Sequence, residues 1–224
     1  MKHTRWTAAL LALALVLSLP FTAAAETFST EDFSLEIPEG MYTFTPSTPV
    51  DDPSWALAGV ADAQGKLEEY RDMGGVVEMV SEDGETSILL TQSTTDDSES
   101  IFNLEDLTEE EQAEFLDGLA QTKTDEIQLE KSYVEINGRL FYRIRFEGVY
   151  QEMGYNELLY GTIINGYSLN LDTYGNLDPV SQETEDLMVS IAETITFPEI
   201  LEKPEITPQD TTQALVTVGL LVVL

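Results

Sequence analysis

Three arginines occupy one face of a single predicted strand, and they are the residues of this sequence best suited to bind an anion. Arg139, Arg143 and Arg145 are separated by even numbers of residues within the segment 139–150, so their side chains point to the same side of a strand. A guanidinium group donates hydrogen bonds in a fixed fork that matches a carboxylate. The chain has 42 Asp and Glu but only 10 Lys and Arg, so three arginines on one strand interrupt a negative field.

We expect a mixed sheet face in which Arg143 and Arg145 lie beside Asn170 and Asp172. The apolar residues predicted among them are Phe141, Leu159 and Ile163. This set predicts a binding patch for a carboxylate or an acidic peptide. The alternative is a charge ladder in which the arginines pair with Glu130 and nearby acids, each exposed pair contributing about 0–1 kcal/mol.

Two residue types needed for much of enzyme chemistry are almost absent. The chain contains no Cys, and its one His is His3. Nucleophile systems built on His or Cys, His-ligated zinc, haem and iron–sulfur sites are therefore not expected. We predict no catalytic residue, no metal ligands and no cofactor. A Ca²⁺ site at 96–99 is a weaker alternative, because that acidic run lacks the glycine and the ligand spacing of an EF-hand loop.

The elements that must position these residues are organised around two Asn-Gly dipeptides. Asn-Gly favours a two-residue type I′ turn, and each pair lies between runs rich in Tyr, Ile, Leu, Phe and Val. We therefore predict a four-stranded antiparallel meander with a middle connection at 151–154. Its strands are expected at 127–136, 139–150, 155–164 and 167–174.

Two-residue turns determine which residues face each other. In the first hairpin Glu130 is expected opposite Arg145, and Tyr133 opposite Tyr142. In the second hairpin, Tyr160 is paired with Leu171 and Leu159 with Asp172. One face of the meander is then apolar and is expected to carry the main core, whereas the other is the mixed face.

Further strands and helices are predicted around the meander by periodicity and capping signals. A helix is expected to begin at Thr108, which forms a capping box with Glu111. Strands are expected at 33–37, 41–45, 76–80 and 86–91, and a solvated loop at 92–100. One long or two short helices are expected from Asp52-Pro53 to Gly74-Gly75, and a last helix from Asp178-Pro179 to Phe197-Pro198.

The two ends of the chain suggest export and a membrane contact. Residues 1–25 have the charged start, apolar core and Ala-rich end of a secretory signal peptide, with a signal anchor as the alternative. Residues 26–198 form the predicted domain, and 199–213 a proline-containing spacer. Residues 214–224 are interpreted as the start of a truncated transmembrane helix, or alternatively as an apolar tail.

The formal net charge of −32 limits the class of partner. Such a field repels nucleic acid and anionic lipid headgroups, and it attracts cations or a basic protein. We therefore expect no nucleic-acid partner.

The predicted order of elements, together with two short motifs, resembles the PsbP-like family. The opening segment 33–40 reads FSLEIPEG, and the end of the last helix at 190–197 reads SIAETITF. The chain also resembles small exported bacterial proteins of that fold with a Pro-x-Trp-x-Leu motif like that at 53–57. The resemblance covers about residues 28–197 and implies an α+β fold, an antiparallel sheet between helical layers, with a binding or assembly role. Metal ligation through His, known in photosynthetic relatives, does not transfer to a domain without His.

These observations together predict a non-enzymatic binding or assembly domain on the extracytoplasmic face of a bacterial membrane. It would be anchored by a single C-terminal helix, or secreted if that segment does not span, and its partner would be an envelope protein or a small ligand. The alternative is an acidic module that binds or senses Ca²⁺. A hydrolase that uses paired carboxylates ranks below both, because no motif sets two carboxylates at a working separation.

Overall fold

A computed structural model of the chain describes residues 26–122, 125–150, 153–175 and 178–204. The predicted signal peptide, the predicted C-terminal membrane helix and most of the predicted spacer lie outside these residues. Within them, no helix combines the length and the apolar character needed to cross a bilayer.

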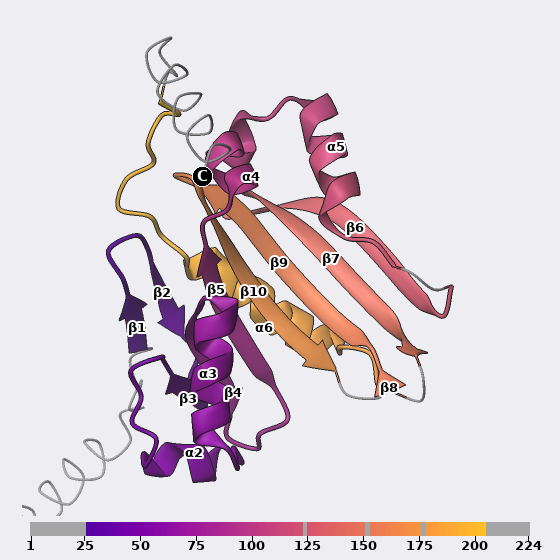
Figure 1. The fold of residues 1–224 in the computed structure, drawn as a ribbon. Helices are drawn as coiled ribbons and strands as arrows, with labels where there is room; N and C mark the ends of the chain where they lie inside the picture. Colours follow the sequence, from indigo (N-terminus) through magenta and orange to yellow (C-terminus); the bar gives the residue numbers. More distant parts are fainter. Residues whose placement is uncertain (1–25, 123–124, 151–152, 176–177, 205–224) are drawn as a thin grey trace, which may run out of the picture.

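The fold is α+β, as predicted, and its centre is a twisted antiparallel sheet (Figure 1). The meander is present and continues into the N-terminal strands, because β10 pairs with β5. The strands lie in the order β3 (Met41–Phe44), β4 (Gly75–Ser81), β5 (Ser87–Ser93), β10 (Tyr167–Gly175), β9 (Asn156–Ile164), β7 (Arg139–Tyr150) and β6 (Ile127–Ile136). A short β8 (Met153–Gly154) pairs with β7, and β1 (Glu26–Ser29) forms a separate hairpin with β2 (Ser34–Ile37).

Both Asn-Gly turns have the register predicted for them. Glu130 faces Arg145 across β6 and β7, and Leu159 faces Asp172 across β9 and β10. Asn137 and Asn165 have φ values of 50° and 51°, which a type I′ turn requires. Pairing within each hairpin is therefore confirmed.

One face of the sheet, called here the α6 face, is covered by α6 (Gln182–Thr194) and the β1–β2 hairpin. The main apolar core lies here and is formed largely by Phe33, Leu35, Met79, Leu90, Phe141, Leu158, Leu169, Leu171, Met188 and Ile191. The helix begins later than the predicted Asp178-Pro179. Ser181 is its N-cap, because the Ser181 hydroxyl accepts a hydrogen bond from the Thr184 amide at 3.1 Å. It also ends at Thr194, before the predicted Phe197-Pro198.

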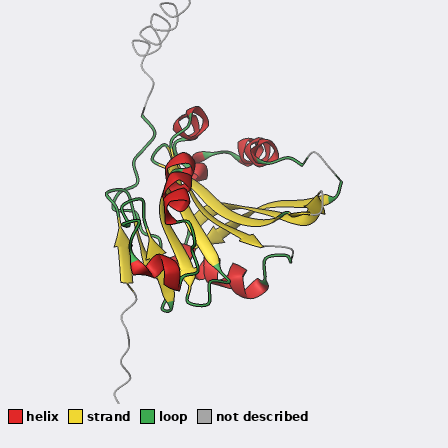
Figure 2. Ribbon diagram, turned by 60° about the horizontal axis from the view of Figure 1, so that its bottom comes forward, coloured by secondary structure: helices red, strands yellow, loops and turns green. Residues whose placement is uncertain are grey.

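The opposite face, called here the α5 face, is covered at two places, so that helices lie on both sides of the sheet (Figure 2). Over β3, β4 and β5 lie α2 (Pro53–Leu57) and α3 (Ala63–Met73), with Trp55 stacked on Phe44 at a centroid distance of 3.9 Å. Over β6, β7 and β9 lie α4 (Asp96–Ile101), a 3-10 helix (Leu104–Asp106) and α5 (Glu109–Leu119).

Two details of the N-terminal half correct or settle the predictions. The segment 92–100 is not a solvated loop, because Thr95 and Ser98 form a capping box that starts α4 and places three acids in its first turn. Between 52 and 74 the chain forms two helices, separated near Gly59, whose φ of 75° is incompatible with a continuous helix.

The Thr108 cap of α5 generates a stability prediction. The Thr108 hydroxyl accepts a hydrogen bond from the Glu111 amide at 3.3 Å, and the Glu111 carboxylate accepts one from the Thr108 amide at 2.8 Å. Replacing Thr108 with Ala should lower the free energy of unfolding by about 0.5–2 kcal/mol, measured from the urea denaturation midpoint. Thr122→Ala, at an exposed position after the helix, is the matched control. Equal midpoints for the two variants would contradict the role of the cap.

Candidate functional site

The four residues predicted to form one binding patch lie on opposite faces of the sheet. Arg143 pairs with Tyr160, so both arginines are on the α6 face. Tyr142 pairs with Gly161, which is in turn opposite Asn170, so Asn170 and Asp172 belong to the α5 face. The predicted mixed face is therefore wrong, although each hairpin was paired correctly.

The error comes from the connection between the two hairpins. The Asn-Gly turns determine parity within a hairpin but say nothing about how β7 meets β9. That register depends on the segment around β8, where Tyr155 donates its amide hydrogen to Gly148 O at 2.8 Å. A change of one residue in this connection exchanges the two faces of one hairpin relative to the other.

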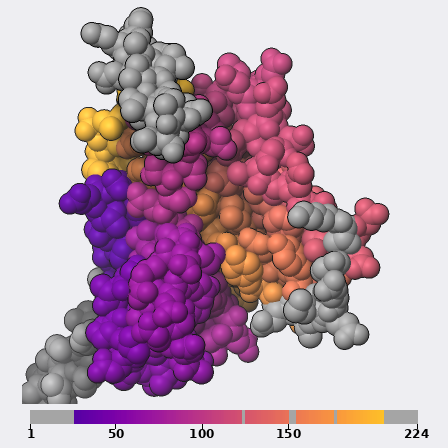
Figure 3. All heavy atoms as spheres, in the orientation of Figure 1, coloured from indigo at the N-terminus to yellow at the C-terminus, as the bar shows by residue number. Residues whose placement is uncertain are grey.

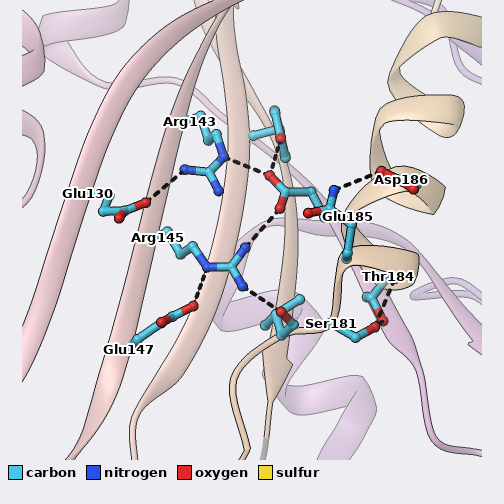
Figure 4. A network of polar contacts seen from close by, with 11 residues as sticks. Glu130, Arg143, Arg145, Glu147, Ser181, Thr184, Glu185 and Asp186 are labelled. Carbon is cyan, nitrogen blue, oxygen red and sulfur yellow. Dashed lines mark hydrogen bonds and ion pairs between the residues drawn. The ribbon is translucent and has the colours of Figure 1, made fainter.

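On the α6 face, Arg143 and Arg145 are held by Glu185 of α6 (Figure 4). Arg143 Nε lies 2.7 Å from Glu185 Oε1, and Arg145 Nη1 lies 2.8 Å from Glu185 Oε2. The Tyr160 hydroxyl donates a third hydrogen bond to Glu185 Oε1 at 2.7 Å. The side chains of the two arginines and of Glu185 are only 17%, 14% and 10% exposed. This is a mostly buried ion-pair network and not an open anion site.

The two arginines make further contacts besides those with Glu185. Arg145 donates to the Val180 carbonyl at 2.5 Å and to the Glu147 carboxylate, and Arg143 Nη1 lies 3.5 Å from Glu130 Oε2. The alternative interpretation, a charge ladder that includes Glu130, therefore describes these contacts, with Glu185 as the main partner.

The network raises the pKa of one member and lowers that of another. Burial favours the neutral form of each group, but it is outweighed by the charged hydrogen bonds. For Arg143, the hydrogen bond with Glu185 holds the pKa above its ordinary value. For Glu185, hydrogen bonds from Arg143 and Tyr160 hold the pKa below its ordinary value. The charges of Arg143 and Glu185 are therefore present at neutral pH.

Arg139, the third arginine of the strand, pairs with Glu105 at 3.3 Å and lies 6.0 Å from the centre of the Phe197 ring. It stands apart from the Glu185 network.

On the α5 face, the Asn170 side chain is hydrogen-bonded to Tyr142. The Tyr142 hydroxyl donates to Asn170 Oδ1 at 2.6 Å. Gly161 makes room for this contact, because a Cβ at this position would lie 2.3 Å from both Asn170 Oδ1 and the Tyr142 ring. Asn170 is thus occupied in orienting a buried tyrosine.

Among the predicted site residues, Asp172 is a buried carboxyl group with an incomplete set of hydrogen bonds in the described part of the chain. It is only 6% exposed and lies between the two apolar clusters of the α5 face, with Leu89 and Leu159 as its cross-strand partners. Tyr174 donates its hydroxyl hydrogen to Asp172 Oδ2 at 3.0 Å. Asp172 Oδ1 is buried, and no donor of the described residues reaches it.

The neighbour of Asp172 is a second carboxyl group, that of Glu157. Glu157 faces Tyr174 across β9 and β10, and Phe146 across β7 and β9. Burial and the Glu157 charge raise the pKa of Asp172 to about 7. Burial also raises the pKa of Glu157, despite its hydrogen bond with Asp172. The two carboxyl groups therefore share a proton below neutral pH.

Two tyrosines complete this group, defined here as the acid–tyrosine cluster: Tyr155, Glu157, Asp172 and Tyr174. Tyr155 and Tyr174 are 46% and 58% exposed. Burial, with the nearby Asp172 and Glu157 charges, raises the pKa of each tyrosine. Tyr155 also packs edge-on against Phe146 at a centroid distance of 5.5 Å.

Sequence reasoning missed Glu157, Tyr155 and Tyr174. A usable signal existed, because the second Asn-Gly turn places Glu157 directly opposite Tyr174 and two pairs away from Asp172, on the same face of the hairpin. Their burial and proximity to Phe146 depend on the β7–β9 register, which that turn does not determine.

Sequence reasoning also missed a second buried acid, Glu78 on β4. Glu78 is 2% exposed and accepts hydrogen bonds from Tyr70, from Lys66 Nζ at 3.1 Å and from the Ser87 hydroxyl at 2.5 Å. Burial alone would lower the pKa of Lys66, but the Glu78 charge raises it. This acid is fully partnered and joins α3 to the sheet.

No group of three or more acidic, His or Cys side chains close enough to hold a metal ion occurs in the described part of the chain. The acidic run at 96–99, considered as a Ca²⁺ site, is the first turn of α4.

Comparisons with known proteins identify similar folds without a family assignment. No protein-family model matches the chain, and no curated protein matches its sequence. The solution structure of cyanobacterial PsbP (CyanoP) from Synechocystis sp. PCC 6803 is similar in fold, with 11% identity over 80% of this chain and 95% of that chain, and a TM-score of 0.42. A crystal structure from Bacteroides thetaiotaomicron VPI-5482 has 11% identity over 78% of this chain and 49% of that chain, with a TM-score of 0.44. PsbP is thus among the structural neighbours, as the sequence motifs suggested, and the likeness concerns fold alone.

The Glu185 network predicts a large stability loss when its carboxylate is removed. Glu185→Ala should lower the free energy of unfolding by about 3–5 kcal/mol, because two mostly buried arginines lose their main partner. The matched control is Glu183→Ala in the same helix, where the side chain is exposed. Chemical denaturation monitored by tryptophan fluorescence measures both, and a similar loss for the two variants would contradict the network.

The acid–tyrosine cluster predicts a pH dependence of stability. Asp172 keeps a proton up to about pH 7 in the folded state, whereas an unfolded Asp releases it above about pH 3.9. Between these values the folded state binds more protons, so its stability falls as pH rises, by up to about 1.4 kcal/mol per pH unit. Asp172→Asn removes this contribution. Urea denaturation at pH 4.5, 6 and 8 should therefore show the advantage of wild type over this variant shrinking toward pH 8, and a constant difference would contradict the assignment.

Proposed function

We propose that residues 26–198 form an extracytoplasmic, non-enzymatic binding domain whose partner docks on the α5 face at the acid–tyrosine cluster. The observation that carries this proposal is the pair of exposed tyrosines beside a buried acid, one oxygen of which no donor among the described residues reaches. Large aromatic side chains with a polar tip are typical of protein–protein contacts, where they add contact area at a small entropic cost.

The position of the cluster supports docking. Figure 3 shows the β9–β10 region at the surface between the N-terminal helices and the α5–β6 region. On the α5 face, α2 and α3 pack over β3, β4 and β5 at one end of the sheet. At the other end, α4, the 3-10 helix and α5 pack over β6, β7 and β9. A partner that approaches between them meets strands rather than a helix.

Electrostatics also favours this surface and a cationic partner. On the α6 face, Arg143 and Arg145 are paired with acids, and the chain as a whole carries a net charge of −32. A partner with positive charge is attracted, and its association is faster at low ionic strength. The signal-like segment 1–25 supports placing this encounter outside the cytoplasm.

Site-specific cross-linking in the producing cells tests the proposal. A photo-reactive phenylalanine analogue at Tyr155 or Tyr174 should give a discrete cross-linked product, whereas the same analogue at exposed Glu36 on β2 should not. Mass spectrometry of the protein from the same cells should show a mature N-terminus near Glu26. Products at Glu36 alone, or a cytoplasmic protein that retains Met1, would contradict the proposal.

A further inference from the structure

The acid–tyrosine cluster has a chemical preference beyond a general docking role. When Asp172 is ionised, its Oδ1 is an acceptor that no donor of the described residues reaches, in a residue that is only 6% exposed. Its neighbour is another carboxyl group, so a bound group that satisfies both must donate hydrogen bonds and carry positive charge.

We propose that this cluster binds an alkylammonium or guanidinium group, namely the side chain of a lysine or arginine presented by a partner. Glu157 and Asp172 supply the two carboxylates that accept from the cation, and the rings of Tyr155 and Tyr174 flank it. This inference rests on the proposed docking function and specifies the chemical class of the partner.

The ring arrangement distinguishes an organic cation from a metal ion. Tyr155 and Phe146 meet edge to face, and Tyr174 lies across the strands from Glu157. Aromatic rings attract cations through their π faces and accommodate the alkyl stem of a lysine or arginine. Calcium requires about six to eight oxygen ligands. The described residues contain no group of three His, Cys, Asp or Glu side chains that could hold a metal ion.

The cation would take the place of the proton shared by the two carboxyl groups. Below pH 7, Asp172 keeps a proton and donates it to Glu157. An ammonium group donates to both oxygens instead, so binding releases that proton. The groups that face Asp172 are Glu157 from β9, Tyr174 from β10 and Tyr155 before β9, whereas the adjacent positions on β5 and β7 hold Leu89 and Phe146.

The experiment is an NMR titration of the full chain with Nα-acetyl-lysine methylamide, with backbone amides of β9 and β10 as the reporters. The shifts should saturate, and the affinity should rise about tenfold from pH 6 to pH 8 as Asp172 ionises near pH 7. The same probe acetylated at Nε has no charge and should leave the spectrum unchanged.

Matched variants separate the site from general electrostatics. Asp172→Asn and Glu157→Gln should each weaken binding at pH 8 at least tenfold, and Asp172→Asn should also remove the pH dependence. Glu135→Gln, which removes one exposed charge from β6, should bind within twofold of wild type. Amide dispersion of each variant reports that it is folded.

Three results would overturn the inference: equal binding by Asp172→Asn and wild type, equal binding of the Nε-acetylated probe, or CaCl₂ shifting the same amides at lower concentration than the lysine probe. The proposed docking function is judged separately. A cross-linked partner whose yield is unchanged in Asp172→Asn would keep that function and remove the cation site. If the wild-type protein gives no cross-linked product but still binds the lysine probe, the cation site would stand and the docking function would be contradicted.

Discussion

The carboxylate of Glu185 is the contact on which the packing of α6 against the sheet depends. It joins two arginines of β7 and a tyrosine of β9 to one helix, and all of these groups are largely withdrawn from water. A buried charge is tolerated only when it is paired. Sliding or rotating α6 would separate these charges, so the network allows one placement of the helix. The apolar core around Met188 and Ile191 supplies most of the attraction without that geometric demand.

The described part of the chain contains three buried acids, and each has a different set of partners. Glu185 has two arginines, whereas Glu78 has one lysine and two hydroxyl groups. Asp172 has one tyrosine hydroxyl, the backbone amide of Thr173 and a second carboxyl group. The first two acids each tie a helix to the sheet, whereas the partners of Asp172 that the structure describes all belong to strands. This difference is why we place a ligand at Asp172 and a structural role at the other two.

The pairing of the arginines changes the expected partner of the domain from an acidic ligand to a basic one. Exposed arginines would have favoured an acidic ligand. In the folded chain Arg143 and Arg145 compensate acids of the same molecule, and Arg139 pairs with Glu105. The solvent-facing charge therefore remains strongly negative, and a basic partner gains most from approaching it.

The sequence by itself determined the local features. Asn137-Gly138 and Asn165-Gly166 determined the two hairpins and their pairings, because a type I′ turn leaves no freedom in register. Thr108 and Glu111 determined where α5 begins, because the cap is formed within one turn. Only the tertiary structure decided which hairpin faces coincide, since the β7–β9 register is set by a connection with no such turn. That single register separates Arg143 and Arg145 from Asn170 and Asp172. It also places the Asp172–Glu157 pair, which the second turn already sets close together, on the face that carries two apolar clusters. Burial of that pair is a property of the assembled sheet, because the residues that exclude water from it come from strands far apart in the chain.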